Sequence, residues 1–67
     1  MTVHVNDQPH ALPAGTTVAA LLERLQLAGR KGVAVAIAGA VVPRREWPVR
    51  ALGDGERVVV IRATQGG

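Results

Sequence analysis

Cysteine, tyrosine and phenylalanine are absent from this chain of 67 residues, and Trp47 is its only aromatic residue. Without cysteine, the chain can form no disulfide and offers no thiolate metal ligand and no thiol nucleophile. A domain of this size buries only about 60% of its unfolded surface. Its core must therefore consist of Val, Leu and Ile side chains, which suffice for one sheet packed on one helix. We expect a single domain.

Long apolar runs are also missing. The longest, from Gly32 to Val42, is too short for a bilayer, which requires roughly 20 residues. The N-terminus does not have the basic and apolar regions of a signal peptide. We therefore expect a cytoplasmic protein without a membrane partner.

Acidic residues are few, five against eight basic ones, which leaves a net charge of +3. Such a balance is typical of proteins that bind nucleic acid or an acidic protein surface. Because the arginines are spread along the chain, we favour an ordinary solvated surface and expect no nucleic-acid partner.

Side chains suited to catalysis are scarce as well. His4 and His10 lie on predicted strands, where we expect them to be exposed, and two histidines without a third ligand make a weak metal site. Asp54 and Glu56 flank Gly55, which favours a role in a turn. No hydroxyl, histidine and carboxylate occur at a persuasive spacing for a triad. We expect no enzyme activity, no bound cofactor and no metal.

One helix is predicted in the first half of the chain. Thr16 or Thr17 can cap its N-terminus through the side-chain oxygen, and it should end near Gln26. Its apolar residues follow the spacing of a single helical stripe: Val18, Leu21, Leu22 and Leu25.

Alternating and β-branched residues predict four to five strands around this helix. They are expected at residues 1–5, 10–12, 33–37, 41–42 and 57–62, with turns at 6–9, 38–40 and 53–56 and a single-turn segment at 44–47. In strand 33–37 the larger residues should face the helix and the alanines the opposite side. The final strand can insert beside the first. This pattern predicts an α+β fold, a small mixed sheet packed on one helix.

The sequence ends in Gly66-Gly67, shortly after the last predicted strand. A diglycine has no side chains, so it is thin and flexible and can enter a narrow channel. With Gly67 as the last residue, it presents a carboxylate that is ionised at neutral pH. We expect a folded domain of residues 1–62 and a flexible diglycine tail of residues 63–67.

Taken together, these features resemble the thiamine-biosynthesis sulfur carriers of the ThiS family, which have the ubiquitin-like β-grasp fold. The strongest match is Val42-Pro43-Arg44-Arg45-Glu46-Trp47, which follows the family pattern V-P-R-x-x-W. Further matches are Asn6-Asp7-Gln8, Thr17-Val18, Leu21-Leu22, Val33-Ala34-Val35-Ala36, Asp54-Gly55-Glu56 and Gly66-Gly67. The chain departs from the family at Ala38-Gly39, where Asn-Gly is usual, and at Ala40, where a polar residue is common.

The resemblance implies a reaction on the carboxylate of Gly67. An E1-like adenylyltransferase of the ThiF type would adenylate it with ATP and magnesium. A sulfur donor, such as a cysteine desulfurase or a rhodanese, would displace AMP and leave a thiocarboxylate. A thiazole synthase of the ThiG type would then take the sulfur. The carrier alone should be a monomer, and the residues expected to enter the partner's channel are Gly66, Gln65, Thr64, Ala63 and Arg62.

A docking patch is predicted on the sheet face that points away from the helix. If Arg57 faces solvent, strand alternation places Val59 and Ile61 on this face, beside Ala34 and Ala36. The opposite alternation, which would turn the other two valines of the strand outward, would remove the patch.

Arg44 and Trp47 are further docking candidates, because Trp and Arg are enriched among interface anchors. The alternative is that Trp47 covers the edge of the core and arginine stems pack on it.

Three other functions stay open. The small subunit of molybdopterin synthase has the same fold and tail, although it is typically longer and lacks the Pro-Arg-x-x-Trp segment. An RNA-binding β-grasp module of some tRNA synthetases has an opening similar to Leu12-Pro13-Ala14-Gly15-Thr16. A protein modifier conjugated to lysines is the third.

Overall fold

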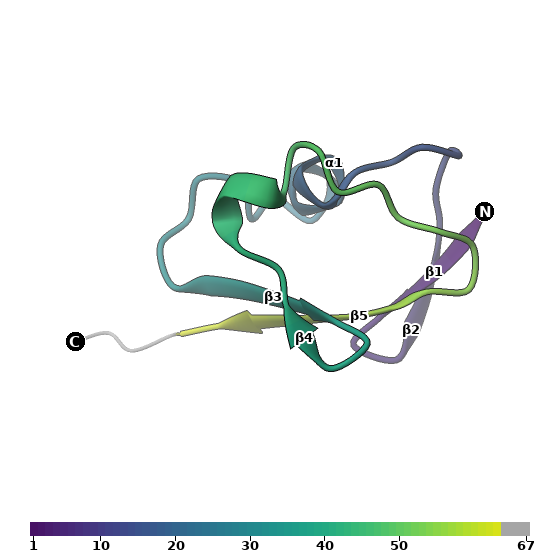
Figure 1. The fold of residues 1–67 in the computed structure, drawn as a ribbon. Helices are drawn as coiled ribbons and strands as arrows, with labels where there is room; N and C mark the ends of the chain where they lie inside the picture. The colour runs from purple at the N-terminus through teal and green to yellow at the C-terminus, as the bar shows by residue number, and fades with distance from the viewer. Residues whose placement is uncertain (64–67) are drawn as a thin grey trace.

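In the computed structural model, which describes residues 1–63, five strands form one mixed sheet that packs on a single α-helix (Figure 1). This is the architecture predicted from the sequence. The elements are β1 (Thr2–Val5), β2 (Gln8–Ala11), α1 (Val18–Arg24), β3 (Val33–Ile37), β4 (Ala40–Val41), the 3-10 helix η1 (Arg44–Glu46) and β5 (Arg57–Arg62).

The last strand, β5, is the centre of the sheet. The strand order is β2-β1-β5-β3-β4, so β5 lies between β1 and β3. It runs parallel to β1 and antiparallel to β3. The predicted insertion of the final strand beside the first is therefore confirmed. As a result, the chain leaves the sheet from its central strand, at the end opposite the N-terminus (Figure 1).

The first hairpin is tighter than predicted. Asn6 and Asp7 alone form its turn, with φ angles of 50° and 69°, as in the two-residue turns that suit hairpins. The second strand therefore begins at Gln8 and ends at Ala11, and the predicted bounds of 10–12 are wrong. It includes Pro9, which is tolerated because β2 is an edge strand and needs no hydrogen bond on its outer side.

The helix begins as predicted but ends early, at Arg24. Its N-cap is Thr17, whose side-chain oxygen accepts a hydrogen bond from the backbone N–H of Ala20 at 3.1 Å. After the helix, Gln26 adopts a φ of 62°. The chain thereby turns back, and the N–H of Leu27 donates to the carbonyl of Leu22 at 2.8 Å, as in a Schellman motif.

The core lies between the helix and one face of the sheet. Leu27 is buried there, whereas Leu25 of the predicted stripe is only partly buried at its edge. The alternation predicted for β3 is confirmed. The buried apolar residues are Val3, Val5, Leu12, Val18, Leu21, Leu22, Leu27, Val33, Val35, Ile37, Val42, Trp47, Leu52, Val58 and Val60.

A tight turn and the short strand β4 follow β3. Ala38 and Gly39 turn the chain with φ angles of 54° and 80°, so alanine here adopts the conformation that the family's usual asparagine tolerates better. β4 is Ala40–Val41, one residue earlier than predicted, and Val42 is buried in the core. No helix within residues 1–63 has the length and apolar character needed to cross a membrane.

Candidate functional site

The base of the tail is held firmly to the domain. Arg62, the last residue of β5, pairs with Val33 of β3. The next residue, Ala63, donates its N–H to the carbonyl of Gly32 at 2.8 Å. The predicted stalk residues Arg62 and Ala63 thus both lie against the start of β3. The other predicted tail residues lie outside the described residues: Thr64, Gln65, Gly66 and Gly67.

Asn6 supports the same strand from the other side. β1 ends at Val5, but the backbone N–H of Asn6 still donates to Val58 at 2.9 Å. Its side-chain amide then accepts a hydrogen bond from the N–H of Val60 at 2.9 Å and donates one to the carbonyl of Val60 at 3.1 Å. The side chain thereby continues the ladder beyond the end of β1. The sequence places Asn6 in a turn and gives no sign of this contact, because the two residues are 54 positions apart in the chain.

The sheet face away from the helix carries an exposed apolar patch. Val59 and Ile61 are 47% and 56% exposed, whereas Val58 and Val60 are buried, so the predicted alternation of β5 is confirmed. Figure 1 shows α1 and η1 on the same side of the sheet, and no element of residues 1–63 covers the other side.

Neighbouring strands extend this patch. Ala36 pairs with Val59, and Ala34 with Ile61, so each pair shares the open face. Val41 pairs with Ala36 from β4 and is 73% exposed. It belongs to the same patch, although the sequence analysis did not include it. Only the pairing register of β4 reveals its position. We refer to these five residues as the open-face patch.

Arg44 and Trp47, the further docking candidates, do not lie on the open face and therefore do not form one docking patch with the residues there. Trp47 is buried, and its indole N–H donates to the carbonyl of Val42 at 3.0 Å. The Arg44 guanidinium lies 4.5 Å from the centre of its ring. Both residues line a hollow of about 230 Å³ beside α1, on the helix side of the sheet. The alternative, a Trp at the edge of the core with an arginine packed on it, is confirmed.

The two histidines cannot act together. His4 pairs with Pro9 and His10 pairs with Val3 across the β1–β2 hairpin, so their side chains point to opposite faces. Both are half-buried, and not exposed as predicted. Residues 1–63 contain no group of three side chains that could hold a metal ion.

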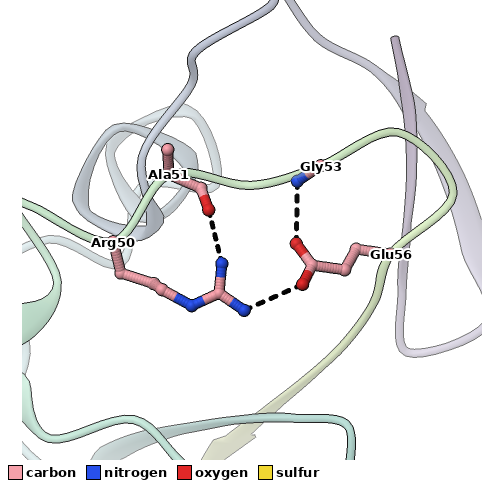
Figure 2. A network of polar contacts seen from close by, with 4 residues as sticks. All are labelled: Arg50, Ala51, Gly53 and Glu56. Atoms are coloured by element: carbon pink, nitrogen blue, oxygen red, sulfur yellow. Dashed lines mark hydrogen bonds and ion pairs between the residues drawn. The ribbon is translucent and has the colours of Figure 1, made fainter.

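The carboxylates of Asp54 and Glu56 support the turn between them. Asp54 accepts a hydrogen bond from the N–H of Thr2 at 2.8 Å. Glu56 accepts a hydrogen bond from the N–H of Gly53 at 2.7 Å. Its other carboxylate oxygen forms an ion pair with the Arg50 guanidinium at 2.8 Å (Figure 2). These bonds, the one from Arg50 first, lower the pKa of Glu56. The carboxylates therefore have the structural role predicted for them.

A second hollow lies near the base of the tail. It has a volume of about 270 Å³ and an apolar floor that includes Leu25, Leu27 and Val60. His10 and Arg62 are among the polar residues at its rim. It is open to solvent beside the strand that leads into the tail.

Comparison with known proteins shows which family the chain matches. Residues 3–67 match the model of the ThiS family. The chain belongs to the ThiS family. It is 36% identical over 67 residues to the sulfur carrier protein ThiS of Escherichia coli (strain K12), and the match covers all of both chains.

A comparison with solved structures also finds the fold of this family. The chain matches the crystal structure of the thiamine biosynthesis protein ThiS from Geobacter metallireducens with a TM-score of 0.82 and 28% identity. This match again covers all of both chains. The ubiquitin-like β-grasp fold predicted from the sequence is therefore confirmed.

Proposed function

We propose that this chain is a sulfur carrier for thiamine biosynthesis and that it carries sulfur as a thiocarboxylate on Gly67. The observation that carries the proposal is the match to the ThiS family, which extends to the final diglycine. The anchored base of the tail supports it, because the pairing of Arg62 with Val33 and the hydrogen bond from Ala63 to Gly32 fix the point from which the tail begins.

The chemistry requires activation of the carboxylate, because a carboxylate is a poor electrophile. An E1-like adenylyltransferase of the ThiF type joins the Gly67 carboxylate to AMP from ATP, with magnesium, and releases pyrophosphate. The terminal sulfur of a persulfide on a donor, such as a cysteine desulfurase or a rhodanese, then attacks the acyl carbon, and AMP leaves with the carboxylate oxygen. A second thiol next attacks the donor's sulfur in the resulting acyl disulfide, so that the sulfur–sulfur bond breaks, the donor and this thiol form a disulfide, and the thiocarboxylate is released. The product has a carbon–sulfur bond in place of a carbon–oxygen bond.

The chain itself acts as a substrate in these steps and not as a catalyst. A thiazole synthase of the ThiG type takes the sulfur from the thiocarboxylate. ATP and magnesium are bound by the activating partner. We place the reaction in the cytoplasm, where ATP is supplied. The open-face patch is the surface on which we expect these partners to dock, because contiguous exposed apolar residues are typical of partner sites.

The absence of cysteine makes this proposal easy to test. The purified chain is incubated with extract of its own cells, ATP and a sulfur source, and is then treated with iodoacetamide. Because the chain contains no thiol of its own, alkylation reports only sulfur that has been added. Intact mass should show oxygen replaced by sulfur before alkylation, and a variant without Gly67 should show neither change.

The E. coli relative, which aligns with the whole chain, is the control for an active extract. If the relative gains sulfur under these conditions and this chain does not, the proposed function is wrong. Transfer of the carried sulfur to thiazole synthase, and not to molybdopterin synthase, distinguishes the thiamine pathway from that of molybdopterin.

A further inference from the structure

Positive charge gathers where the chain leaves the sheet. Arg30 and Lys31 directly precede Gly32, whose carbonyl accepts the N–H of Ala63, and Arg62 directly precedes Ala63. The three cationic side chains belong to exposed residues. They therefore lie within two positions along the chain of the two residues that form the hydrogen bond at the base of the tail. We call Arg30, Lys31 and Arg62 the basic collar.

No carboxylate within residues 1–63 balances this charge. The two ion pairs in this part of the chain are Arg50–Glu56 and Arg57–Asp7, and neither includes a residue of the collar. The sequence also has no acidic residue between Glu23 and Glu46, and none after Glu56. The loop before β3 and the strand that leads into the tail therefore carry only positive charges, and β3 between them is uncharged.

The collar is also open to a partner. Arg62 lies at the rim of the hollow of about 270 Å³, and Arg30 is held in place by a hydrogen bond from its Nε to the carbonyl of Gln26 at 3.2 Å. Because only three residues separate Arg62 from the diglycine, a protein that accepts the tail must bring the mouth of its channel close to the collar. Uncompensated charges at such a place steer association with a surface of opposite sign.

We propose that the basic collar docks on an acidic surface that surrounds the channel of the adenylating partner. This inference rests on the proposed function and adds the charge of the partner's surface. The collar speeds the encounter with the partner and orients the tail toward the channel, while the open-face patch supplies contact area on another face. Its contribution is electrostatic, so it must weaken as salt is added.

The test is the rate of association with the purified E1-like adenylyltransferase of the same organism, measured by stopped-flow fluorescence. Lys31→Glu and Arg62→Glu should each slow association about three- to tenfold at ~20 mM salt, within the range known for electrostatic steering. At about 1 M salt, where the screening length is only about 3 Å, the variants should match the parent chain. Arg62→Lys, which keeps the charge, should behave like the parent.

Arg45→Glu is the matched control. Arg45 is exposed and lies on η1, and it forms no ion pair or side-chain hydrogen bond within residues 1–63. The Arg45→Glu variant has the same change in net charge as the collar variants and should alter the association rate by less than about twofold. Circular dichroism checks that every variant is folded.

Three results would overturn the inference. Equal rates for the collar variants and Arg45→Glu would mean that only net charge matters. Faster association of the collar variants would mean that the collar holds the chain's own terminal carboxylate. Salt-dependent binding of a labelled oligouridine that is lost in the collar variants, with unchanged enzyme association, would assign the collar to nucleic acid. The proposed function fails separately, when the parent chain itself gains no sulfur.

Discussion

The side-chain amide of Asn6 uses both its acceptor and a donor on the backbone of a single residue, Val60. The two hydrogen bonds, at 2.9 and 3.1 Å, lie where β1 has ended and β5 continues toward the tail. Without them, the N–H and carbonyl groups of Val60 would lose their partners on this side. The asparagine thus stabilises the part of the central strand that carries the tail.

We therefore predict that Asn6→Gly destabilises the fold by about 1–2 kcal/mol, since two partly buried hydrogen bonds are lost. Glycine keeps the positive φ of 50° without strain, so the change isolates the side-chain bonds. Urea denaturation measures the loss, and the amide of Val60 should exchange faster with solvent. Asp7→Gly is the control: it alters the other turn residue and should be neutral or slightly stabilising.

The open-face patch leads to a second prediction. Val59→Thr and Ile61→Thr together keep the β-branching of the side chains and add hydroxyl groups at exposed positions; the first also keeps the side-chain shape, and the second shortens the side chain by one methyl group. We expect about tenfold weaker binding to the adenylyltransferase, because buried interface anchors typically contribute more than about 1 kcal/mol. Isothermal titration calorimetry measures the affinity.

The matched control for the patch is Val49→Thr. Val49 is even more exposed, at 78%, but it lies in the segment after η1 and not on the open face. The affinity of the Val49→Thr variant for the adenylyltransferase should equal that of the parent chain. If Val49→Thr weakens binding as much as the double variant of Val59 and Ile61 does, the open face is not the docking surface.

Gly32 gives a third prediction, which concerns the position of the tail. A Cβ atom at Gly32 would lie 3.0 Å from the Cβ of Ala63 and 3.3 Å from its carbonyl oxygen. Gly32→Ala should therefore displace Ala63 and slow sulfur loading of Gly67 several-fold, while the fold loses about 1 kcal/mol through its positive φ.

Gly29→Ala separates these two effects. Gly29 has the same φ of 77°, but a Cβ there meets no atom within 4 Å. This variant should lose similar stability and keep the normal rate of loading, as measured by alkylation with iodoacetamide. Equal rates for the two variants would show that the contact with Ala63 does not position the tail.

Glu56 gives a prediction about pH. Its pKa is lowered, first by the hydrogen bond from Arg50 and then by the one from Gly53. A carboxylate with a lowered pKa stabilises the fold above its unfolded pKa, and this contribution is lost as the pH falls through the folded value. The bonds lie at the partly exposed turn in Figure 2, so the contribution is modest.

We predict that Glu56→Gln destabilises the fold by about 1 kcal/mol at pH 7, because the amide can still accept from Gly53 but cannot pair with the arginine. The difference from the parent chain should shrink as the pH falls below the pKa of an unfolded glutamate, about 4.3, and be lost once the pH has fallen through the lowered pKa of the folded chain. Urea denaturation at several pH values measures it. A difference that stays constant down to pH 3 would contradict the role of the charge.

Local patterns were enough to predict most of the architecture. The spacing of Val18, Leu21 and Leu22 predicted the helix, and alternation in β3 predicted which of its side chains are buried. The end of the helix was placed too late, because Gln26 adopts a left-handed conformation that residue type does not favour. Pro9 concealed the start of β2, since only an edge position makes proline acceptable in a strand.

The sequence by itself determined the single domain, the strands and helix, the lack of thiol chemistry and the terminal diglycine, because these follow from residue type and short-range spacing. Only the tertiary structure decided which distant residues meet. It separated Trp47 from the open face, brought Val41 to it, placed Asn6 against Val60 and joined Ala63 to Gly32, so that the two segments that carry the collar meet. These relationships depend on strand order and register, which no local pattern encodes.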